Sequence, residues 1–150
     1  MSRKTVNDPR AAAVGPYSHG VWAGELLFLS GQTPIDAATR TLVEGDVGTQ
    51  TRQCLANLAA VLSQAGLGLG DAIKCNVYLV DMADFAAMNT AYRDAFGEPF
   101  PARTTVGVAA LPLGARVEIE LVARRPPRDC AGASASPWSA LRPRRRLPNL

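Results

Sequence analysis

Polar residues at the ends of two predicted strands are the first candidates for chemistry in this sequence. Arg103 opens one strand just after Pro101, and its planar guanidinium suits a carboxylate or phosphate ligand bound through two hydrogen bonds. An exposed arginine or a structural ion pair is the alternative interpretation. Glu118 and Glu120 lie two residues apart, so both project from one face of a later strand. Such a pair suits general acid–base catalysis, although acids are more often part of a solvated surface.

Other reactive side chains give weaker predictions. A Gly-Pro turn signal precedes Tyr17 and could aim its ring, which otherwise packs at the edge of the domain. His19 is the only histidine, and no cysteine or carboxylate lies near it at ligand spacing, so we expect no metal site. Cys54 and Cys75 fall on predicted apolar stripes, where buried inert thiols are the usual interpretation.

Two common catalytic or cofactor motifs are absent. The glycine-rich stretch at residues 66–70 lacks the lysine and hydroxyl residue of a phosphate-binding loop, and it follows a helical pattern instead of a strand. Ser30 is not part of a Gly-x-Ser-x-Gly motif. The sequence therefore indicates neither a nucleotide cofactor nor a serine nucleophile, and we expect no cofactor.

Composition limits the classes of protein that fit. The chain has 150 residues, of which 47% are hydrophobic and 19% charged, as in one globular domain. No apolar run reaches the roughly 18 residues of a membrane helix, and none follows the charged N-terminus as in a secretory signal. The cysteines are odd in number and widely spaced, which favours a reducing cytoplasm. We expect a cytoplasmic protein that does not contact membranes.

The net charge of +3 comes from the last part of the chain. Residues 1–125 hold 11 Lys/Arg and 12 Asp/Glu, which gives −1 and weakens any prediction of nucleic-acid binding. Residues 126–150 hold 5 Arg and one Asp, which gives +4, and they contain 5 of the 11 prolines without any periodicity. We therefore predict a domain over 1–125 and a disordered tail over 126–150.

The first half of the domain reads as a hairpin followed by a helix. Strands are predicted over 18–23 and 26–32, joined by a Gly-Glu turn whose leading glycine favours type II′. A helix is predicted from an Asp46 cap to about Ala65, because apolar residues recur there every three or four positions and glycines follow.

The second half adds three strands and one helix. Alternation of apolar residues predicts strands over 72–80, 103–110 and 116–124, and a helix over 82–96 lies between the first two. The predicted order is ββαβαββ, an α+β arrangement with both helices on one face of a single sheet. The other face is half apolar, and another copy of the subunit is its simplest cover.

Five short patterns together resemble the Rid family of reactive intermediate deaminases, also called the YjgF family. They occur in order between about residues 10 and 124, so the resemblance covers nearly the whole predicted domain. Each pattern is short, but the combination in this order is specific. The patterns are Gly15-Pro16-Tyr17-Ser18, Ser30-Gly31-Gln32, the helix around Asn89, Pro101-Ala102-Arg103-Thr104-Thr105-Val106 and Val117-Glu118-Ile119-Glu120.

The resemblance implies a chorismate-mutase-like subunit in a homotrimer, with sites in clefts between subunits. It implies hydrolysis of 2-imino acids, such as 2-iminobutanoate and 2-iminopropanoate, to 2-oxo acids and ammonia without a metal or cofactor. By this resemblance Arg103 binds the substrate carboxylate and Glu118 holds or activates the water. The further positions that it places around the pocket are Tyr17, Ser30, Gly31, Asn89 and Thr105.

The sequence departs from the family pattern at two positions and leaves other functions open. His19 stands where glutamine is common. Thr105 stands where some members have cysteine, so the thiol is absent and the backbone carbonyl of residue 105 remains to orient the water. The alternatives are a Rid-like enzyme for another imine or enamine, a ligand sensor or protein-protecting module, and the ribonuclease activity ascribed to some relatives. The intact Arg103 and Glu118 favour the deaminase, and the charge of −1 disfavours the ribonuclease.

Overall fold

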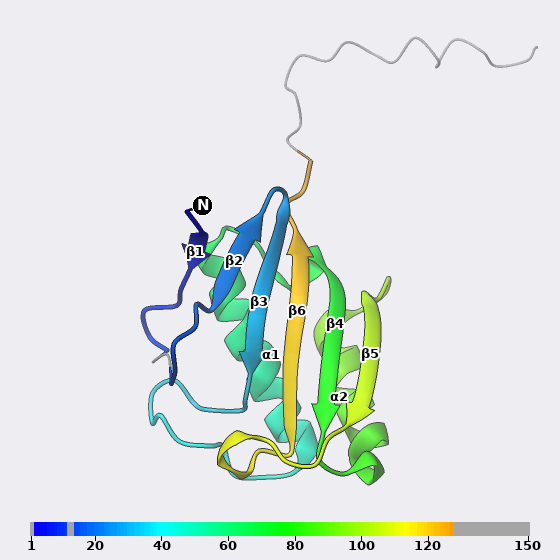
Figure 1. Ribbon diagram of the computed structural model, residues 1–150. Helices are drawn as coiled ribbons and strands as arrows, with labels where there is room; N and C mark the ends of the chain where they lie inside the picture. Colours follow the sequence, from blue (N-terminus) through cyan, green and yellow to red (C-terminus); the bar gives the residue numbers. More distant parts are fainter. Residues whose placement is uncertain (1, 12–13, 128–150) are drawn as a thin grey trace, which may run out of the picture.

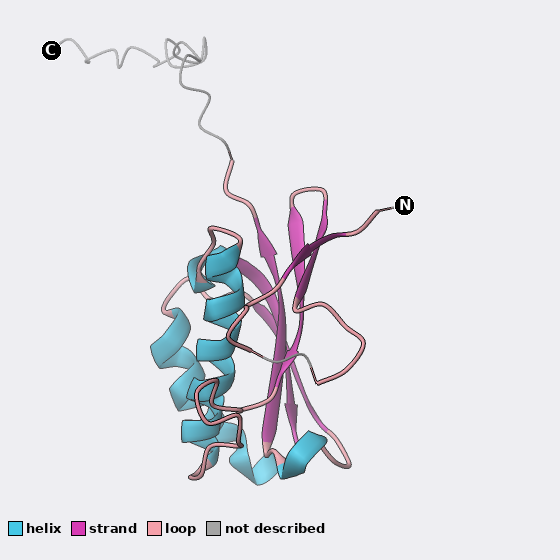
Figure 2. Ribbon diagram, turned by 90° about the vertical axis from the view of Figure 1, so that its left-hand side faces the viewer, coloured by secondary structure: helices cyan, strands magenta, loops and turns pink. Residues whose placement is uncertain are grey.

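The computed structural model describes residues 2–11 and 14–127, and it has two layers. Figure 1 looks onto the uncovered face of a sheet, and Figure 2 shows from the side that both long helices lie against the opposite face. Most of the predicted tail, residues 128–150, falls outside the described residues. Within the described ranges, no helix combines the length and the apolar character needed to cross a bilayer.

Six strands form the sheet in the order β1-β2-β3-β6-β4-β5. The strands are β1 (Lys4–Val6), β2 (Gly20–Ala23), β3 (Leu26–Gln32), β4 (Ala72–Leu79), β5 (Ala102–Gly107) and β6 (Val117–Arg124). Neighbouring strands run antiparallel, except that β4 and β5 are parallel. A parallel pair needs a crossover connection, and the segment containing the second helix supplies it.

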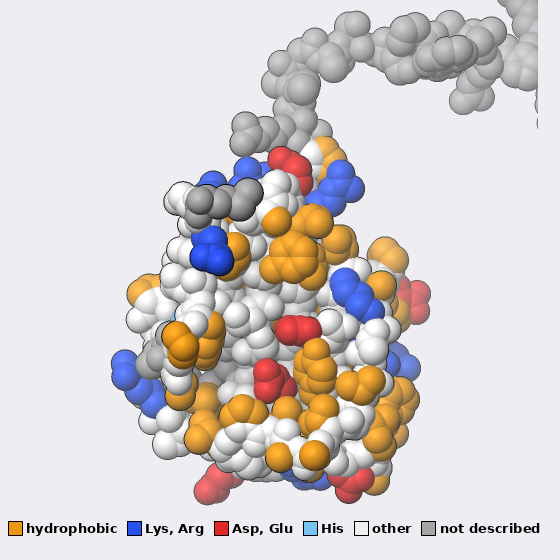
Figure 3. All heavy atoms as spheres, in the orientation of Figure 1, with side chains coloured by type: hydrophobic (Ala, Val, Ile, Leu, Met, Phe, Trp, Pro, Cys, Tyr) orange, Lys and Arg blue, Asp and Glu red, His pale blue; other side chains and the backbone are white. Residues whose placement is uncertain are grey.

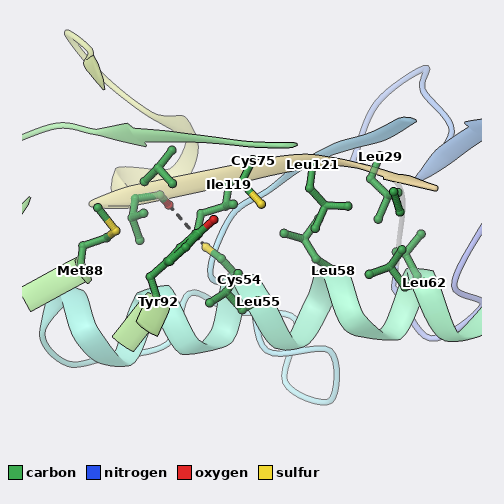
Figure 4. Packing of buried hydrophobic residues seen from close by; sticks show 14 of the residues in the cluster. Leu29, Cys54, Leu55, Leu58, Leu62, Cys75, Met88, Tyr92, Ile119 and Leu121 are labelled. Carbon is green, nitrogen blue, oxygen red and sulfur yellow. Dashed lines mark hydrogen bonds between the residues drawn. The ribbon is translucent and has the colours of Figure 1, made fainter. Parts of the chain in front are cut away.

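The helices are α1 (Val47–Gln64) and α2 (Phe85–Phe96), with short 3₁₀ turns at Leu69–Asp71, Met82–Asp84 and Pro112–Gly114. Asp46 caps α1, since its carboxylate accepts a hydrogen bond from the Thr49 amide at 2.8 Å. The apolar stripe of α1 packs on the centre of the sheet. Figure 4 shows Leu58 and Leu62 on α1 facing Leu29 and Leu121 on the strands.

The predicted order is confirmed apart from the first strand. The structure has βββαβαββ, because β1 adds to the edge of β2 through pairs such as Lys4 with Trp22. Strand 26–32 and the Asp46-capped helix are confirmed, whereas the strand predicted over 103–110 ends at Gly107. The backbone of the turn between β2 and β3 fits the predicted type II′. Its first central residue, Gly24, has a φ of +60°, and its second, Glu25, does not have a positive φ.

The uncovered face carries both apolar and acidic side chains. Phe28 on β3 is 49% exposed and lies between Val21 and Val122 of the adjacent strands, while Val106 on β5 is 41% exposed. Figure 3 shows hydrophobic side chains around acidic ones near the middle of this face. Exposed apolar area of this kind is typical of a surface that another protein covers. Trimeric assembly stays a prediction.

Candidate active site

Glu118 on β6 projects from the uncovered face of the sheet against Gly31 on β3. A β-carbon added at Gly31 would overlap Oε1 of Glu118 and lie 3.0 Å from its Cδ. Gly31 also sits where the pairing of β3 with β6 shifts register, between Leu29 and Gln32. Because position 31 has no side chain, the carboxylate of Glu118 can lie flat against the backbone of β3.

The surroundings of Glu118 favour its protonated form. Burial raises the pKa of Glu118, and the nearby Glu120 carboxylate raises it further. Glu120 is held in place, since its Oε1 accepts hydrogen bonds from Asn76 Nδ2 and from the Tyr78 hydroxyl, both at 2.8 Å. The bond to Glu120 also raises the pKa of Tyr78. Once ionised, Glu118 is therefore a stronger proton acceptor than an ordinary surface carboxylate.

A cavity of about 730 Å³ opens beside Glu118, and Tyr17, Ser30 and Gly31 line it as well. Ser30 ties the segment after Tyr17 to β3, because its hydroxyl donates to the Ser18 carbonyl at 2.7 Å and its amide donates to the His19 carbonyl at 2.9 Å. Tyr17 itself is 45% exposed. The structure thus brings these predicted residues to one cavity.

His19 lines the same cavity, but its hydrogen bonds are structural. Its Nδ1 accepts a hydrogen bond from the Asp8 amide at 3.0 Å, and its own amide donates to Asn7 Oδ1 at 3.0 Å. These bonds fasten the segment after β1 alongside the start of β2. Among residues 2–11 and 14–127, no group of three or more His, Cys, Asp or Glu side chains is arranged to hold a metal ion.

Arg103 lies on β5 and faces the helix layer. Its guanidinium carbon is 4.8 Å from the centre of the Tyr92 ring and 5.7 Å from that of Phe85, both on α2. Within the described part of the chain, no carboxylate lies within 4.0 Å of this guanidinium. Its N–H groups are therefore not engaged by an internal ion pair, and they suit an anionic ligand.

Unpaired polar atoms gather in the same layer. Asn89 Oδ1, Tyr92 Oη and Thr105 Oγ1 are buried and have no hydrogen-bond partner among the described residues. Thr105 follows Arg103 by two residues on the same face of β5, and Asn89 precedes Tyr92 by one helical turn. Buried polar groups are normally hydrogen-bonded, so the unpaired oxygens of Asn89 and Thr105 are candidates for contact with a ligand.

Tyr92 and Phe85 were not predicted as site residues. The apolar residues of α2 place this helix on the core side of the sheet, but their spacing gives no indication that two of its rings contact Arg103. Knowing which helix packs over which strand would have provided the signal. Their contact with Arg103 depends on α2 lying directly across β5.

Arg103 and Glu118 do not meet within one chain. Strand β4 lies between β5 and β6, and Arg103 pairs with Cys75 while Glu118 pairs with Tyr78, three residues further along β4. At about 4.8 Å between strands and about 3.3 Å per residue, the two α-carbons are roughly 14 Å apart, and their side chains leave opposite faces. The predicted residues therefore form two clusters, and a site that uses both clusters needs two copies of the chain.

Comparison with known proteins assigns the family. Residues 7–125 match the family model described as Endoribonuclease L-PSP, to which YjgF, RidA and RutC proteins belong. The chain belongs to this family, the Rid family. The resemblance inferred from the five short patterns is thereby confirmed.

Three Rid proteins illustrate how similar the relatives are. A RutC family protein of Pyrococcus horikoshii is 50% identical over 119 residues, covering 79% of this chain and 93% of the relative. A Salmonella typhimurium protein named 2-iminobutanoate/2-iminopropanoate deaminase is 42% identical over 128 residues, covering 83% and 99%. The crystal structure of E. coli TdcF with bound serine superposes with a TM-score of 0.76 at 40% identity, covering 81% and 98%. The fold and an enzyme-like family are established, while the names of the relatives vary.

Proposed function

We propose that this Rid protein hydrolyses 2-imino acids, such as 2-iminobutanoate and 2-iminopropanoate, to 2-oxo acids and ammonia. The observation that carries the proposal is Arg103, whose guanidinium faces two aromatic rings and no carboxylate among the described residues. Relatives named deaminase support it, and so does TdcF, whose bound serine has a carboxylate and a nitrogen on the adjacent carbon.

Arg103 would bind the substrate. A 2-imino acid is an anion at its carboxylate, and its protonated C=N carbon is an electrophile. Two parallel hydrogen bonds from the guanidinium would fix the carboxylate and hold that carbon in a defined place. The unpaired oxygens of Asn89 and Thr105 lie in the same layer and would complete the polar surroundings of the substrate.

Glu118 would act on the water. Its carboxylate would accept a proton as the water oxygen forms a bond to the imine carbon, and the C=N electron pair would move to nitrogen. The nitrogen of the resulting carbinolamine would receive that proton back from Glu118, and its C–N bond would then break to release ammonia. As the C–N bond breaks, the hydroxyl proton would pass to the ionised Glu118 carboxylate and the C–O bond would become the carbonyl of the 2-oxo acid. The raised pKa of Glu118 suits these proton transfers. The backbone carbonyl of Thr105 would help to orient the water.

The two clusters would meet between copies of the chain. We propose a homotrimer in which the Arg103 cluster of one subunit faces the Glu118 cluster of its neighbour. The exposed Phe28 and Val106 support this assembly, because contact between copies would cover the apolar part of the open face. The mass of the assembly by light scattering on a sizing column tests it, and a monomer would contradict the shared site.

A coupled assay tests the activity. A threonine dehydratase generates 2-iminobutanoate, and the decay of the imine is followed with and without the protein. Removing one partner of a buried charged pair costs about 2–5 kcal/mol, so Arg103→Ala should lose roughly thirty-fold to several-thousand-fold in kcat/KM. Arg103→Lys should recover little, because an ammonium lacks the planar fork, whereas Glu118→Gln should mainly lower kcat. Near-normal kcat/KM in an assembled Arg103→Ala variant would refute the proposal.

Mixing two inactive variants tests the shared site separately. Subunits with Arg103→Ala keep the Glu118 cluster, and subunits with Glu118→Gln keep the Arg103 cluster. In a mixed cyclic trimer one interface of three would join two intact clusters, so random 1:1 exchange should restore roughly a quarter of wild-type activity. If both clusters of a site came from the same chain, mixing would restore nothing.

A further inference from the structure

The guanidinium of Arg103 is held by aromatic faces. The Tyr92 ring centre lies 4.8 Å from its Cζ and the Phe85 ring centre 5.7 Å, distances at which a cation is attracted to a ring face. Arg103 forms no ion pair among residues 2–11 and 14–127. We propose that Tyr92 is a positioning residue, whose ring fixes the plane of the Arg103 guanidinium for the substrate carboxylate. This inference rests on the proposed function, in which Arg103 binds that carboxylate.

Tyr92 is better fixed than Phe85. Its side chain is buried, with 4% of its surface exposed, and its ring packs against Phe96 with the ring centres 4.5 Å apart. Figure 4 shows the Tyr92 ring between α2 and the sheet, with its hydroxyl pointing towards the strands. Phe85 is 38% exposed and lies further from the guanidinium. A ring that cannot turn is the one that can restrict an adjacent side chain.

An aromatic ring restrains the arginine without competing with the substrate carboxylate for the guanidinium N–H groups. An aspartate or glutamate in the place of Tyr92 would occupy the N–H groups of the guanidinium, and the substrate would have to displace it. A ring face attracts the charge but accepts none of the in-plane N–H bonds, so these stay available for two-point binding. An unrestrained arginine would lose several side-chain rotors when it binds, which weakens affinity.

The ring, and not the hydroxyl, carries this role. The Tyr92 hydroxyl is buried beside the Cys75 thiol and forms no hydrogen bond to a nitrogen or oxygen atom of the described residues. Replacing it by hydrogen therefore gives up at most a weak contact with sulfur and keeps the aromatic face. Tyr92→Phe and Tyr92→Leu form a matched pair, because both fill the core but only phenylalanine keeps a face towards Arg103.

Steady-state kinetics on this pair is the first test. Tyr92→Phe should keep KM and kcat within about twofold. Tyr92→Leu should raise KM by roughly 2- to 30-fold, the range expected for a lost cation–ring contact, while kcat changes less. Leu58→Ala in α1 is the control for instability, since Leu58 is fully buried among α1 and the sheet. It should lower the melting temperature and leave KM unchanged.

A second measurement does not depend on turnover. In ¹⁵N spectra of arginine side chains, the Arg103 Nε–H signal is identified by its loss in Arg103→Lys. The ring current of Tyr92 should shift this signal, and the shift should persist in Tyr92→Phe and disappear in Tyr92→Leu. The affinity for 2-oxobutanoate, measured by calorimetry, should weaken only in Tyr92→Leu.

The outcomes separate the two proposals. If Tyr92→Leu keeps the wild-type KM, 2-oxobutanoate affinity and Nε–H shift, or if Tyr92→Phe is impaired as strongly as Tyr92→Leu, the positioning role is wrong. If the wild-type protein hydrolyses no imine but the Arg103 signal and the 2-oxobutanoate affinity depend on the Tyr92 ring, the deaminase proposal fails and the positioning role stands.

Discussion

Gly31→Ala is the substitution whose effect follows most directly from the geometry. The added methyl group would overlap Oε1 of Glu118 and lie 3.0 Å from Cδ and 3.2 Å from Cγ. The backbone of Gly31 is not in the left-handed conformation, so alanine fits it without backbone strain. The overlap is therefore relieved by movement of the Glu118 side chain, which must turn away from β3.

The expected fall in kcat follows from the displacement of the Glu118 carboxylate. A reacting group misplaced by about 1 Å can cost roughly 100-fold in rate, so we expect kcat to fall by roughly 100-fold. KM should change little, because Arg103 lies in the other cluster and keeps its contacts with Tyr92 and Phe85. An extra methyl group in a packed place typically costs about 1–3 kcal/mol of stability, which leaves the protein folded.

A double-mutant cycle shows whether Gly31→Ala lowers kcat through its effect on Glu118. Steady-state imine hydrolysis is measured for Gly31→Ala, Glu118→Ala and the double variant, and urea unfolding confirms that each is folded. If alanine at 31 acts by displacing Glu118, the double variant should be no slower than Glu118→Ala alone. A Gly31→Ala protein with wild-type kcat, or rate losses that multiply in the double variant, would refute the reasoning.

Three further predictions follow from the same structure. Glu118 has a pKa above its usual value of 4.5 and acts as a base when ionised, so kcat should fall as the pH drops through that raised pKa. Glu120→Gln removes the neighbouring negative charge that helps to raise the pKa of Glu118, so this variant should move the acidic limb of the pH profile to lower pH. Leu58→Ala leaves a cavity beneath the sheet and should lower the free energy of unfolding by about 3 kcal/mol in urea titrations. Treatment with EDTA should leave kcat unchanged, and loss of activity restored by a divalent cation would contradict the proposed mechanism.

The sequence predicts the longer elements well because their patterns are redundant. Helix α1 has a cap, a long apolar stripe and terminating glycines, and all three agree. Strand β1 has only three residues, which are too few for an alternation to be recognised. It is a strand only because it pairs with β2, and that pairing cannot be read from its own residues. Alternation along β4 would put Ile73 on the core face with Cys75, but the register shift between Ala72 and Lys74 leaves Ile73 44% exposed.

Site residues could be predicted one by one, but not how they are arranged. The short patterns identify Arg103 and Glu118 as candidates, and alternation places each on one face of its own strand. Sequence alone does not state that β4 lies between β5 and β6, and this order separates the two residues. It also gives no sign that Gly31 faces Glu118, since that contact depends on the pairing of β3 with β6.

The placement of the two clusters on opposite faces of the sheet has a consequence for protein concentration. A chain that carries Arg103 on one face and Glu118 on the other contains every residue of the proposed site but no complete site. Any reaction that needs both clusters must then lose specific activity on dilution, once the concentration falls below the dissociation constant of the assembly. The amount of protein in the cell would thus set the fraction of chains that are active as well as the number of chains present.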